Sequence, residues 1–201
     1  MVNVPVDRKP MDIVGALILA AGQSRRYGSE DKRIVKLDNG RRVIEQTIAN
    51  CQSAGLPARV VLRPDEEALK QICLKQGASV VIAQDAELGM GHSLAAGIKE
   101  CDAWVGCLVT LADMPFVKPA TYQLIAEALQ GHDIVRPFYQ GKPGQPNGFS
   151  RHYFGQLREC NGDVGAKALF KTEAVHELVI DDEGILADID VPGQLSGPRD
   201  V

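Results

Sequence analysis

Residues 17–28 read "LILAAGQSRRYG", an apolar run that breaks at a glycine and continues into two arginines and a second glycine. The apolar run begins at residue 13, and its unbroken hydrophobicity predicts a strand over residues 13–19 that is covered on both faces, as in a parallel sheet. After such a strand, backbone N–H groups of small residues can approach an anion closely, and arginine offers a fork of donors that suits phosphate. The stretch therefore indicates either an anion-binding turn or an ordinary exposed turn at the end of a central strand.

Spacing excludes the two most familiar phosphate-binding loops. The dinucleotide fingerprint Gly-x-Gly-x-x-Gly needs a glycine two residues after Gly22, and Ser24 stands there. The P-loop needs four residues between its glycines and then a lysine, whereas five residues separate Gly22 from Gly28 and no lysine follows directly. If the turn binds phosphate, it does so in another way.

A signal peptide begins in a similar way. Arg8 and Lys9 precede the apolar run, and small residues follow it. However, Asp7 and Asp12 flank a run of only nine residues, and cleavage after it would leave the rest of the motif without its strand. We therefore expect a cytoplasmic protein.

The composition describes a globular chain of 201 residues, with 45% hydrophobic and 24% charged residues and a net charge of −4. This length predicts a single domain over residues 1–201, with tails at 1–11 and 196–201. A net negative chain has no basic field that would attract nucleic acid, and no apolar run approaches the roughly 20 residues of a membrane span. We therefore expect neither nucleic acid nor a membrane as a partner.

The cysteine pattern argues against two further kinds of structure. The chain has five cysteines, an odd number, and no Cys-x-x-Cys pair. This pattern argues against a disulfide framework and against a zinc knuckle. We expect most of the cysteines to be small buried side chains.

The rest of the chain alternates between strand-like and helical patterns. Apolar runs predict strands over residues 58–63, 78–84, 104–113, 133–138 and 174–180. Apolar residues at helical spacing predict helices over residues 43–55, 65–77, 93–101, 119–131, 152–160 and 164–171. The alternation predicts an α/β fold of three layers, α/β/α, around a mainly parallel, doubly wound, Rossmann-like sheet. Ligands of such sheets bind at the carboxyl ends of the strands, so the residues there are the candidates for a site.

An acidic residue occupies one such position, and a second acidic pair lies near the C-terminus. Asp113 ends the predicted strand 104–113, and because aspartate is seldom buried without a partner, it is either a turn cap or a metal ligand. Asp188 and Asp190 alternate in "ADIDVPG", which places both on one face of an extended segment. That pair is either a second metal-binding element or the exposed edge of a strand.

A glycine-rich turn follows the predicted strand 78–84. In "QDAELGMGHSLAAG", Gly89 and Gly91 permit close backbone approach, and Ser93 is the expected N-cap of the helix over 93–101. Backbone groups in such a turn could read the edge of a nucleobase. The alternative is an ordinary turn with a good cap.

Taken together, "LAAGQSRRYG", Lys32, "GMGHSLAAG" and "LADMP" resemble the nucleotidyltransferases of molybdenum cofactor biosynthesis, over residues 13–195. The later segments "GKPGQPNGF", "NGDVGAKAL" and "ADIDVPG" are similar to those of the molybdenum cofactor cytidylyltransferases. The resemblance implies a fold of the nucleotide-diphospho-sugar transferase type. It also implies transfer of CMP from CTP to the phosphate of molybdenum-bound molybdopterin, with release of pyrophosphate and with Mg²⁺, or alternatively Mn²⁺, as cofactor.

The same resemblance implies roles for individual residues. The nucleotide would be bound by Leu19, Ala20, Ala21, Gly22, Ser24, Arg25, Lys32, Gln84, Gly89, Gly91 and Ser93. Arg25, Lys32 and Asp113 would be catalytic, and the metal would be held by Asp113 with Asp188 or Asp190. A substrate-facing insertion over residues 139–165 would contact the pterin through Gly144, Gln145, Pro146, Asn147 and Asp163.

Three positions depart from that family's usual pattern. Tyr27 stands where methionine or phenylalanine is usual, and Gln145 stands where histidine is frequent. The segment "DIDVPGQL" lacks the Thr-Pro-Glu-Asp continuation that is usual after Asp-Ile-Asp. Ala21 occupies a position where guanylyl-transferring relatives tend to have glycine, and its methyl group favours the smaller base of CTP, a preference worth only ~1–3 kcal/mol.

Other functions share this scaffold. One is transfer of GMP to molybdopterin, and another couples CTP or UTP to a sugar or alcohol phosphate. A third is a carrier without catalytic activity that hands the cofactor to a molybdenum hydroxylase apoprotein or to its chaperone, because a fold alone does not fix function.

Overall fold

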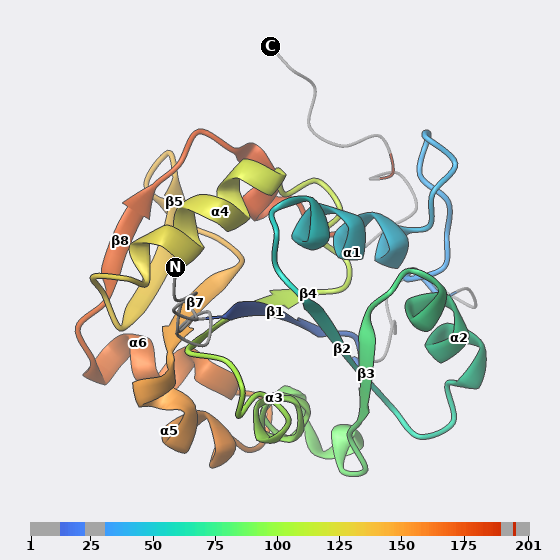
Figure 1. The fold of residues 1–201 in the computed structure, drawn as a ribbon, viewed down its shortest axis with the longest axis horizontal. Coiled ribbons are helices and arrows are strands. Elements are labelled where there is room, and N and C mark those ends of the chain that lie inside the picture. The colour runs from blue at the N-terminus through green and yellow to red at the C-terminus, as the bar shows by residue number, and fades with distance from the viewer. Residues whose placement is uncertain (1–12, 23–30, 190–194, 196–201) are drawn as a thin grey trace, which may run out of the picture.

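The structure is a computed structural model that describes residues 13–22, 31–189 and 195. A sheet of eight strands lies between two layers of helices, so the predicted three-layer α/β/α fold is confirmed (Figure 1). The strands are β1 (Val14–Leu19), β2 (Ala58–Leu62), β3 (Ser79–Ile82), β4 (Gly106–Leu111), β5 (Ile134–Tyr139), β6 (Lys142–Pro143), β7 (Asn147–Ser150) and β8 (His176–Val179). The α-helices are α1 (Val43–Ser53), α2 (Glu67–Lys75), α3 (Met90–Lys99), α4 (Pro119–Ala128), α5 (Phe154–Arg158) and α6 (Leu169–Thr172).

The sheet has the order β3-β2-β1-β4-β7-β5-β6, with β8 paired to β5. The pairs among β1, β2, β3 and β4 are all parallel, as is the pair of β5 with β8, whereas β7 runs antiparallel to both β4 and β5. The predicted mainly parallel sheet is therefore present, with one reversed strand in its interior.

The reversed strand comes from the segment that the sequence presented as an insertion. Residues 139–165 supply β6 and β7, and β7 fills the gap between β4 and β5. Glycine is required within β7, because a Cβ atom on Gly148 would lie 2.9 Å from Cγ2 of Ile125 in α4. The segment is therefore part of the sheet as well as a candidate substrate-facing element.

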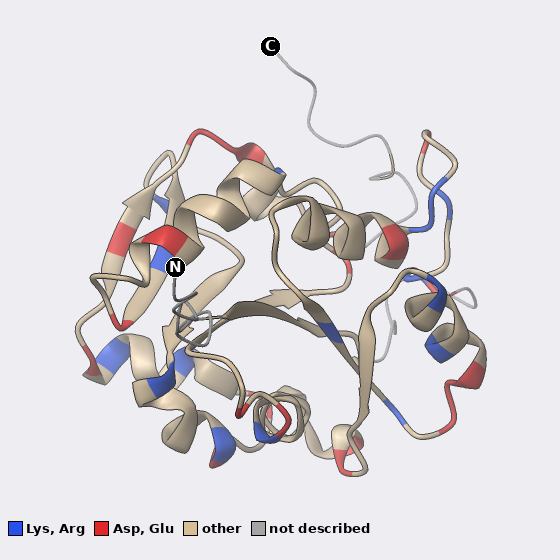
Figure 2. Ribbon diagram, in the orientation of Figure 1, with Lys and Arg blue, Asp and Glu red and all other residues tan. Residues whose placement is uncertain are grey.

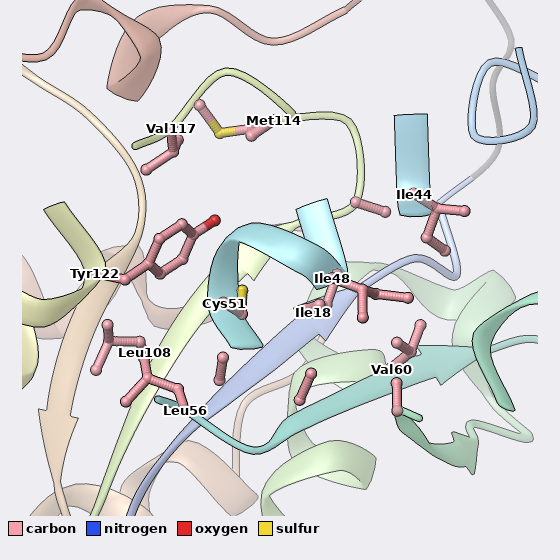
Figure 3. Close-up of a cluster of buried hydrophobic side chains, with 14 of the residues drawn as sticks. Ile18, Ile44, Ile48, Cys51, Leu56, Val60, Leu108, Met114, Val117 and Tyr122 are labelled. Atoms are coloured by element: carbon pink, nitrogen blue, oxygen red, sulfur yellow. The ribbon is translucent and has the colours of Figure 1, made fainter. Parts of the chain in front are cut away.

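Strand β1 lies at the centre and packs a different core on each face. Ala16 and Ile18 face a cluster built with α1, α2 and α4, part of which is drawn in Figure 3. Leu17 and Leu19 face a second cluster built mainly with α3, α5 and α6. This alternation is the reason for the unbroken apolar run, because both faces of the strand are buried. It also places residues 20–22, which follow β1, between the two helix layers (Figure 1).

The expectation for the cysteines agrees with the structure. Charged residues gather on the helices and connections that surround the sheet (Figure 2). All five cysteines are free, and four of them are buried, as expected. Within the described ranges, no helix is long and apolar enough to cross a membrane.

Close packing at the start of β1 gives a test of the core. A Cβ atom on Gly15 would lie 2.3 Å from the ring of Trp104, so Gly15→Ala should destabilise the protein by about 1–3 kcal/mol through overpacking. Denaturant unfolding followed by the fluorescence of Trp104, the single tryptophan, measures the change. Gly155→Ala in α5 is the matched control, because no atom lies within 4 Å of its Cβ position and the change should be neutral or slightly stabilising. An equal loss in both variants would contradict the packing argument.

Candidate functional site

A cavity of about 370 Å³ opens at the carboxyl ends of β1 and β4, where the fold class predicts a ligand. Its lining combines small residues with three cations and three carboxylates. The lining residues are Leu19, Ala20, Ala21, Gly22, Lys32, Arg33, Arg63, Ala86, Glu87, Gly89, Met90, Ser93, Leu111, Ala112, Asp113 and Asp163.

Arg33 is a cationic residue of the cavity that two carboxylates and a backbone carbonyl hold in place. Its guanidinium donates to the carbonyl of Ala20 and forms ion pairs with Asp31 at 2.6 Å and with Glu66 at 2.5 Å. Burial disfavours the charged form of Arg33, but the hydrogen bonds that its guanidinium donates to the two carboxylates outweigh burial and raise its pKa above the ordinary value. The residues that follow β1 are therefore tied to the start of α2, of which Glu66 is the N-cap.

Glu66 is shared by two arginines. Arg63, directly after β2, pairs with the same carboxylate oxygen at 2.7 Å. Burial would raise the pKa of Glu66, but the hydrogen bonds from Arg33 and Arg63 hold it below its usual value. Glu66 therefore holds two guanidinium groups at one side of the cavity. Together with Lys32 they form the basic wall, which consists of Lys32, Arg33 and Arg63.

Asp113 is the second residue after β4 and faces Lys32. Its Oδ2 atom is 2.5 Å from Nζ of Lys32, and the side chains of Lys32 and Asp113 are 15% and 14% exposed. Its Oδ1 atom is buried and has no hydrogen-bond partner among the described residues. A buried carboxylate oxygen without a donor fits a hard cation such as Mg²⁺, which prefers oxygen ligands.

The second predicted metal-binding segment reaches the same place. The backbone N–H of Ile189 donates to the carbonyl of Asp113 at 2.9 Å, which brings the neighbouring Asp188 to this end of the sheet. Asp190 lies outside the described residues. No group of three histidine, cysteine or acidic side chains suited to a metal occurs in the described ranges.

The glycine turn differs from its prediction at the helix start. Helix α3 begins at Met90 with Gly89 as its N-cap, so the expectation that Ser93 caps the helix is wrong. The reason is a partner far away in sequence, because the carbonyl of Gly162 accepts the N–H of Gly91 at 2.7 Å and satisfies an otherwise free donor of the first turn. Ser93 lies buried inside the helix and lines the cavity.

The structure brings together many of the predicted residues and separates others. Lining the cavity are Leu19, Ala20, Ala21, Gly22, Lys32, Gly89, Ser93, Asp113 and Asp163. Not among the lining residues are Gln84, Gly91, Asp188, Gly144, Gln145, Pro146 and Asn147. Ser24 and Arg25, like Asp190, lie outside the described residues.

The segment 144–147, predicted to face the second substrate, packs against the C-terminal part of the chain. The N–H of Gln145 donates to the carbonyl of Ile185 at 2.9 Å, and a Cβ atom on Gly144 would lie 2.5 Å from that carbonyl oxygen. The side-chain amide of Asn147 donates to Oε1 of Gln145 at 2.8 Å. Asp163, predicted for the same substrate, lies apart from this segment and lines the cavity.

Sequence reasoning missed two arginines of the basic wall. Arg63 is the last residue of the predicted strand 58–63, so the rule that strand ends form the site would have found it. Arg33 gives no such signal, because its partner Glu66 is 33 residues away. Glu87 and Met90 were also missed, although both flank predicted site residues in the glycine turn.

Comparison with known proteins agrees with this geometry. The family model of the MobA-like NTP transferase domain matches residues 16–178. The purine catabolism protein PucB of Bacillus subtilis is 29% identical over 189 residues, which cover 88% of this chain and 91% of PucB. The bifunctional protein GlmU of Geotalea daltonii is 28% identical over 116 residues, and the matched part of the chain spans 25% of its length.

Solved structures give the same result. Rv0371c of Mycobacterium tuberculosis superposes with a TM-score of 0.80 at 27% identity, over 90% of this chain and 94% of that one. The same protein in complex with manganese gives a TM-score of 0.71 at 25% identity, over 92% and 94% of the two chains. These similarities extend over nearly the whole chain.

Proposed function

Because the chain belongs to the family of MobA-like NTP transferases, we propose that it transfers CMP from CTP to the phosphate of molybdenum-bound molybdopterin and releases pyrophosphate. The observation that carries this proposal is the cavity, in which a basic wall, a buried carboxylate oxygen and a glycine turn meet. The basic wall suits a triphosphate, the carboxylate oxygen suits a divalent cation, and the glycine turn suits a base. We expect the reaction to occur in the cytoplasm, and a molybdenum hydroxylase apoprotein or its chaperone to receive the product.

The basic wall and the turn after β1 suit the triphosphate. Backbone groups of residues 19–22, with Ser24, would approach the phosphates, and Arg25, Lys32 and Arg63 would offset their charge. Gly89 and Ser93, which line the cavity, are proposed to contact the base, together with Gly91 and Gln84, which lie outside its lining. Residues 144–147 are proposed to contact the pterin, and Ala21 is the sequence feature that favours CTP over GTP.

Asp113 is proposed to hold Mg²⁺ or Mn²⁺, together with Asp188 or Asp190. The orphaned Oδ1 atom supports this assignment, as does the manganese complex of the mycobacterial protein. When bound, the cation supplies Lewis-acid stabilisation of charge at the α-phosphate. Lys32, which pairs with Asp113 at 2.5 Å, would then contact the phosphates.

For this reaction the protein must position the two substrates and neutralise the negative charge of their phosphates. An oxygen of the pterin phosphate attacks the α-phosphorus of CTP in line, and pyrophosphate leaves. The attacking phosphate is already ionised near neutral pH, since its second pKa is ~6, so no general base is needed. Lys32 and Arg25 would stabilise the negative charge of the departing pyrophosphate.

A thermal-shift panel followed by a turnover assay tests the proposal. CTP, GTP, ATP and UTP are compared with Mg²⁺, and a ligand at 100 times its Kd should add about 2.7 kcal/mol of stability. Pyrophosphate release is then measured with CTP and molybdenum-bound molybdopterin. We expect CTP to stabilise most and release to need both substrates. Greater stabilisation by GTP would overturn the choice of CTP, and pterin binding without pyrophosphate release would favour a carrier.

A further inference from the structure

Two turns that are far apart in sequence form one unit at the end of the cavity. The N–H of Gly91 donates to the carbonyl of Gly162 at 2.7 Å, and the N–H of Gly162 donates to Nδ1 of His92 at 3.2 Å. A Cβ atom on Gly89 would lie 2.4 Å from the carbonyl carbon of Gly162, and one on Gly91 would lie 2.5 Å from the carbonyl oxygen of Asn161. Both glycines are therefore required by the docking of residues 161–163 onto the glycine turn.

This docking brings the carboxylate of Asp163 to the glycine turn. Its Oδ1 atom would lie 2.8 Å from a Cβ atom on Gly89, and the residue lines the cavity. Asp163 is exposed, and no hydrogen bond or ion pair to another described residue occupies its carboxylate. The carboxylate is therefore available to a ligand in the cavity.

The charges of the cavity are divided between two walls. In the basic wall, Arg33 and Arg63 pair with Glu66, the N-cap of α2, and Lys32 pairs with Asp113. Glu87 lies in the turn before α3, and Asp163 lies beside Gly89, the N-cap of α3. Helices α2 and α3 cover opposite faces of the sheet (Figure 1). Two carboxylates repel phosphate, so the acidic wall does not suit the triphosphate. It suits the uncharged base of the same nucleotide, with the phosphates directed to the cations.

A carboxylate distinguishes bases by their exocyclic groups. It accepts a hydrogen bond from the N4 amino group of cytosine, and it is repelled by the O4 carbonyl that uracil has at the same place. We propose that Asp163 accepts a hydrogen bond from the amino group of the cytosine base, and that His92 is a positioning residue that holds the 161–163 turn on the glycine turn. The inference rests on the proposed function and deepens it, and it assigns Asp163 to the nucleotide instead of the pterin.

Equilibrium binding of CTP and UTP to the full chain with Mg²⁺, measured by titration calorimetry, tests the role of Asp163. We expect the wild type to bind CTP about 10-fold more tightly than UTP, or better. Asp163→Asn should reduce this ratio to about 3-fold or less, because its carboxamide can present an N–H to uracil. Glu159→Gln is the matched control, since it removes the same charge from an exposed position outside the cavity and should leave the ratio unchanged.

A pair of substitutions at His92 separates positioning from general stability. His92→Leu removes the acceptor for Gly162, and His92→Asn returns an acceptor oxygen close to the place of Nδ1. We expect His92→Leu to lower the CTP/UTP ratio and to raise the KM for CTP more than it lowers kcat, and His92→Asn to restore both. Equal ratios in His92→Leu and the wild type would overturn the positioning role.

The results for the two proposals can be told apart, because nucleotide binding needs no second substrate. Equal affinity of the wild type for CTP and UTP, or an unchanged ratio in Asp163→Asn, would overturn the inference even if pyrophosphate is released with the pterin. Tighter binding of GTP than of CTP would overturn the cytidine part of the proposed function and the commitment to the cytosine amino group. Absence of pterin-dependent turnover, with a ratio that falls in Asp163→Asn, would overturn the proposed function and support the inference.

Discussion

Replacing Asp113 by asparagine should abolish turnover while the protein keeps its fold and part of its affinity for CTP. The substitution keeps the shape of the side chain but removes the charge that pairs with Lys32 at 2.5 Å, and it replaces a carboxylate oxygen by an amide at a buried position. An amide is a weaker ligand for Mg²⁺ than a carboxylate, and loss of several kcal/mol of charge stabilisation at the α-phosphate lowers kcat about 10³-fold.

The measurement is pyrophosphate release at saturating CTP over a series of Mg²⁺ concentrations, with nucleotide affinity measured separately by calorimetry. Asp181→Asn is the control, because this aspartate is exposed and lies outside the cavity, and its activity should match the wild type. Near-normal turnover of Asp113→Asn at saturating Mg²⁺ would show that Asp113 is not the metal ligand. A large loss of CTP affinity with an unchanged kcat would assign Asp113 to nucleotide binding only.

The sequence was sufficient to predict the central part of the fold and the end of the sheet at which the cavity lies. The run of apolar residues at 13–19 predicts β1 because both of its faces are buried, and Asp113 was singled out because a carboxylate rarely ends such a strand without a partner. In a parallel sheet these positions share one edge, so proximity in space follows from topology alone. The cavity lined by Lys32 and Asp113 is therefore a consequence of local pattern and fold class.

What could not be predicted depends on partners distant in the sequence. Ser93 has a good N-cap side chain, yet α3 starts at Met90 because the carbonyl of Gly162 satisfies the N–H of Gly91. Strand β7 was hidden by its glycine and by the prolines before it, because its place in the sheet depends on packing against α4 and not on its own propensity. Local patterns carry no information about either contact.

Arg33→Met should cost about 3–5 kcal/mol of stability at neutral pH, because it removes one partner of a buried ion-pair network and leaves the other charges behind. The side chain of Arg33 is 7% exposed, and it connects Asp31, Glu66 and the carbonyl of Ala20. Lys70→Met is the control for an exposed pair, since Lys70 and Glu67 are 38% and 67% exposed and such pairs contribute at most about 1 kcal/mol. Chemical denaturation of the three proteins measures the difference.

The dependence of this difference on pH distinguishes an ion-pair network from lost packing. Burial would raise the pKa values of Glu66 and Asp31, but the hydrogen bonds that Arg33 donates to both carboxylates lower them. Carboxyl groups whose pKa is lowered in the folded state contribute stability above their ordinary pKa values, here 4.5 and 3.8, and lose it as the pH falls through the folded values. The difference between the wild type and Arg33→Met should therefore be largest near pH 7 and shrink below about pH 4. A difference that stays constant down to that pH would mean that Arg33 acts through packing of its aliphatic stem, and the basic wall would then lack the electrostatic anchor that the nucleotide site requires.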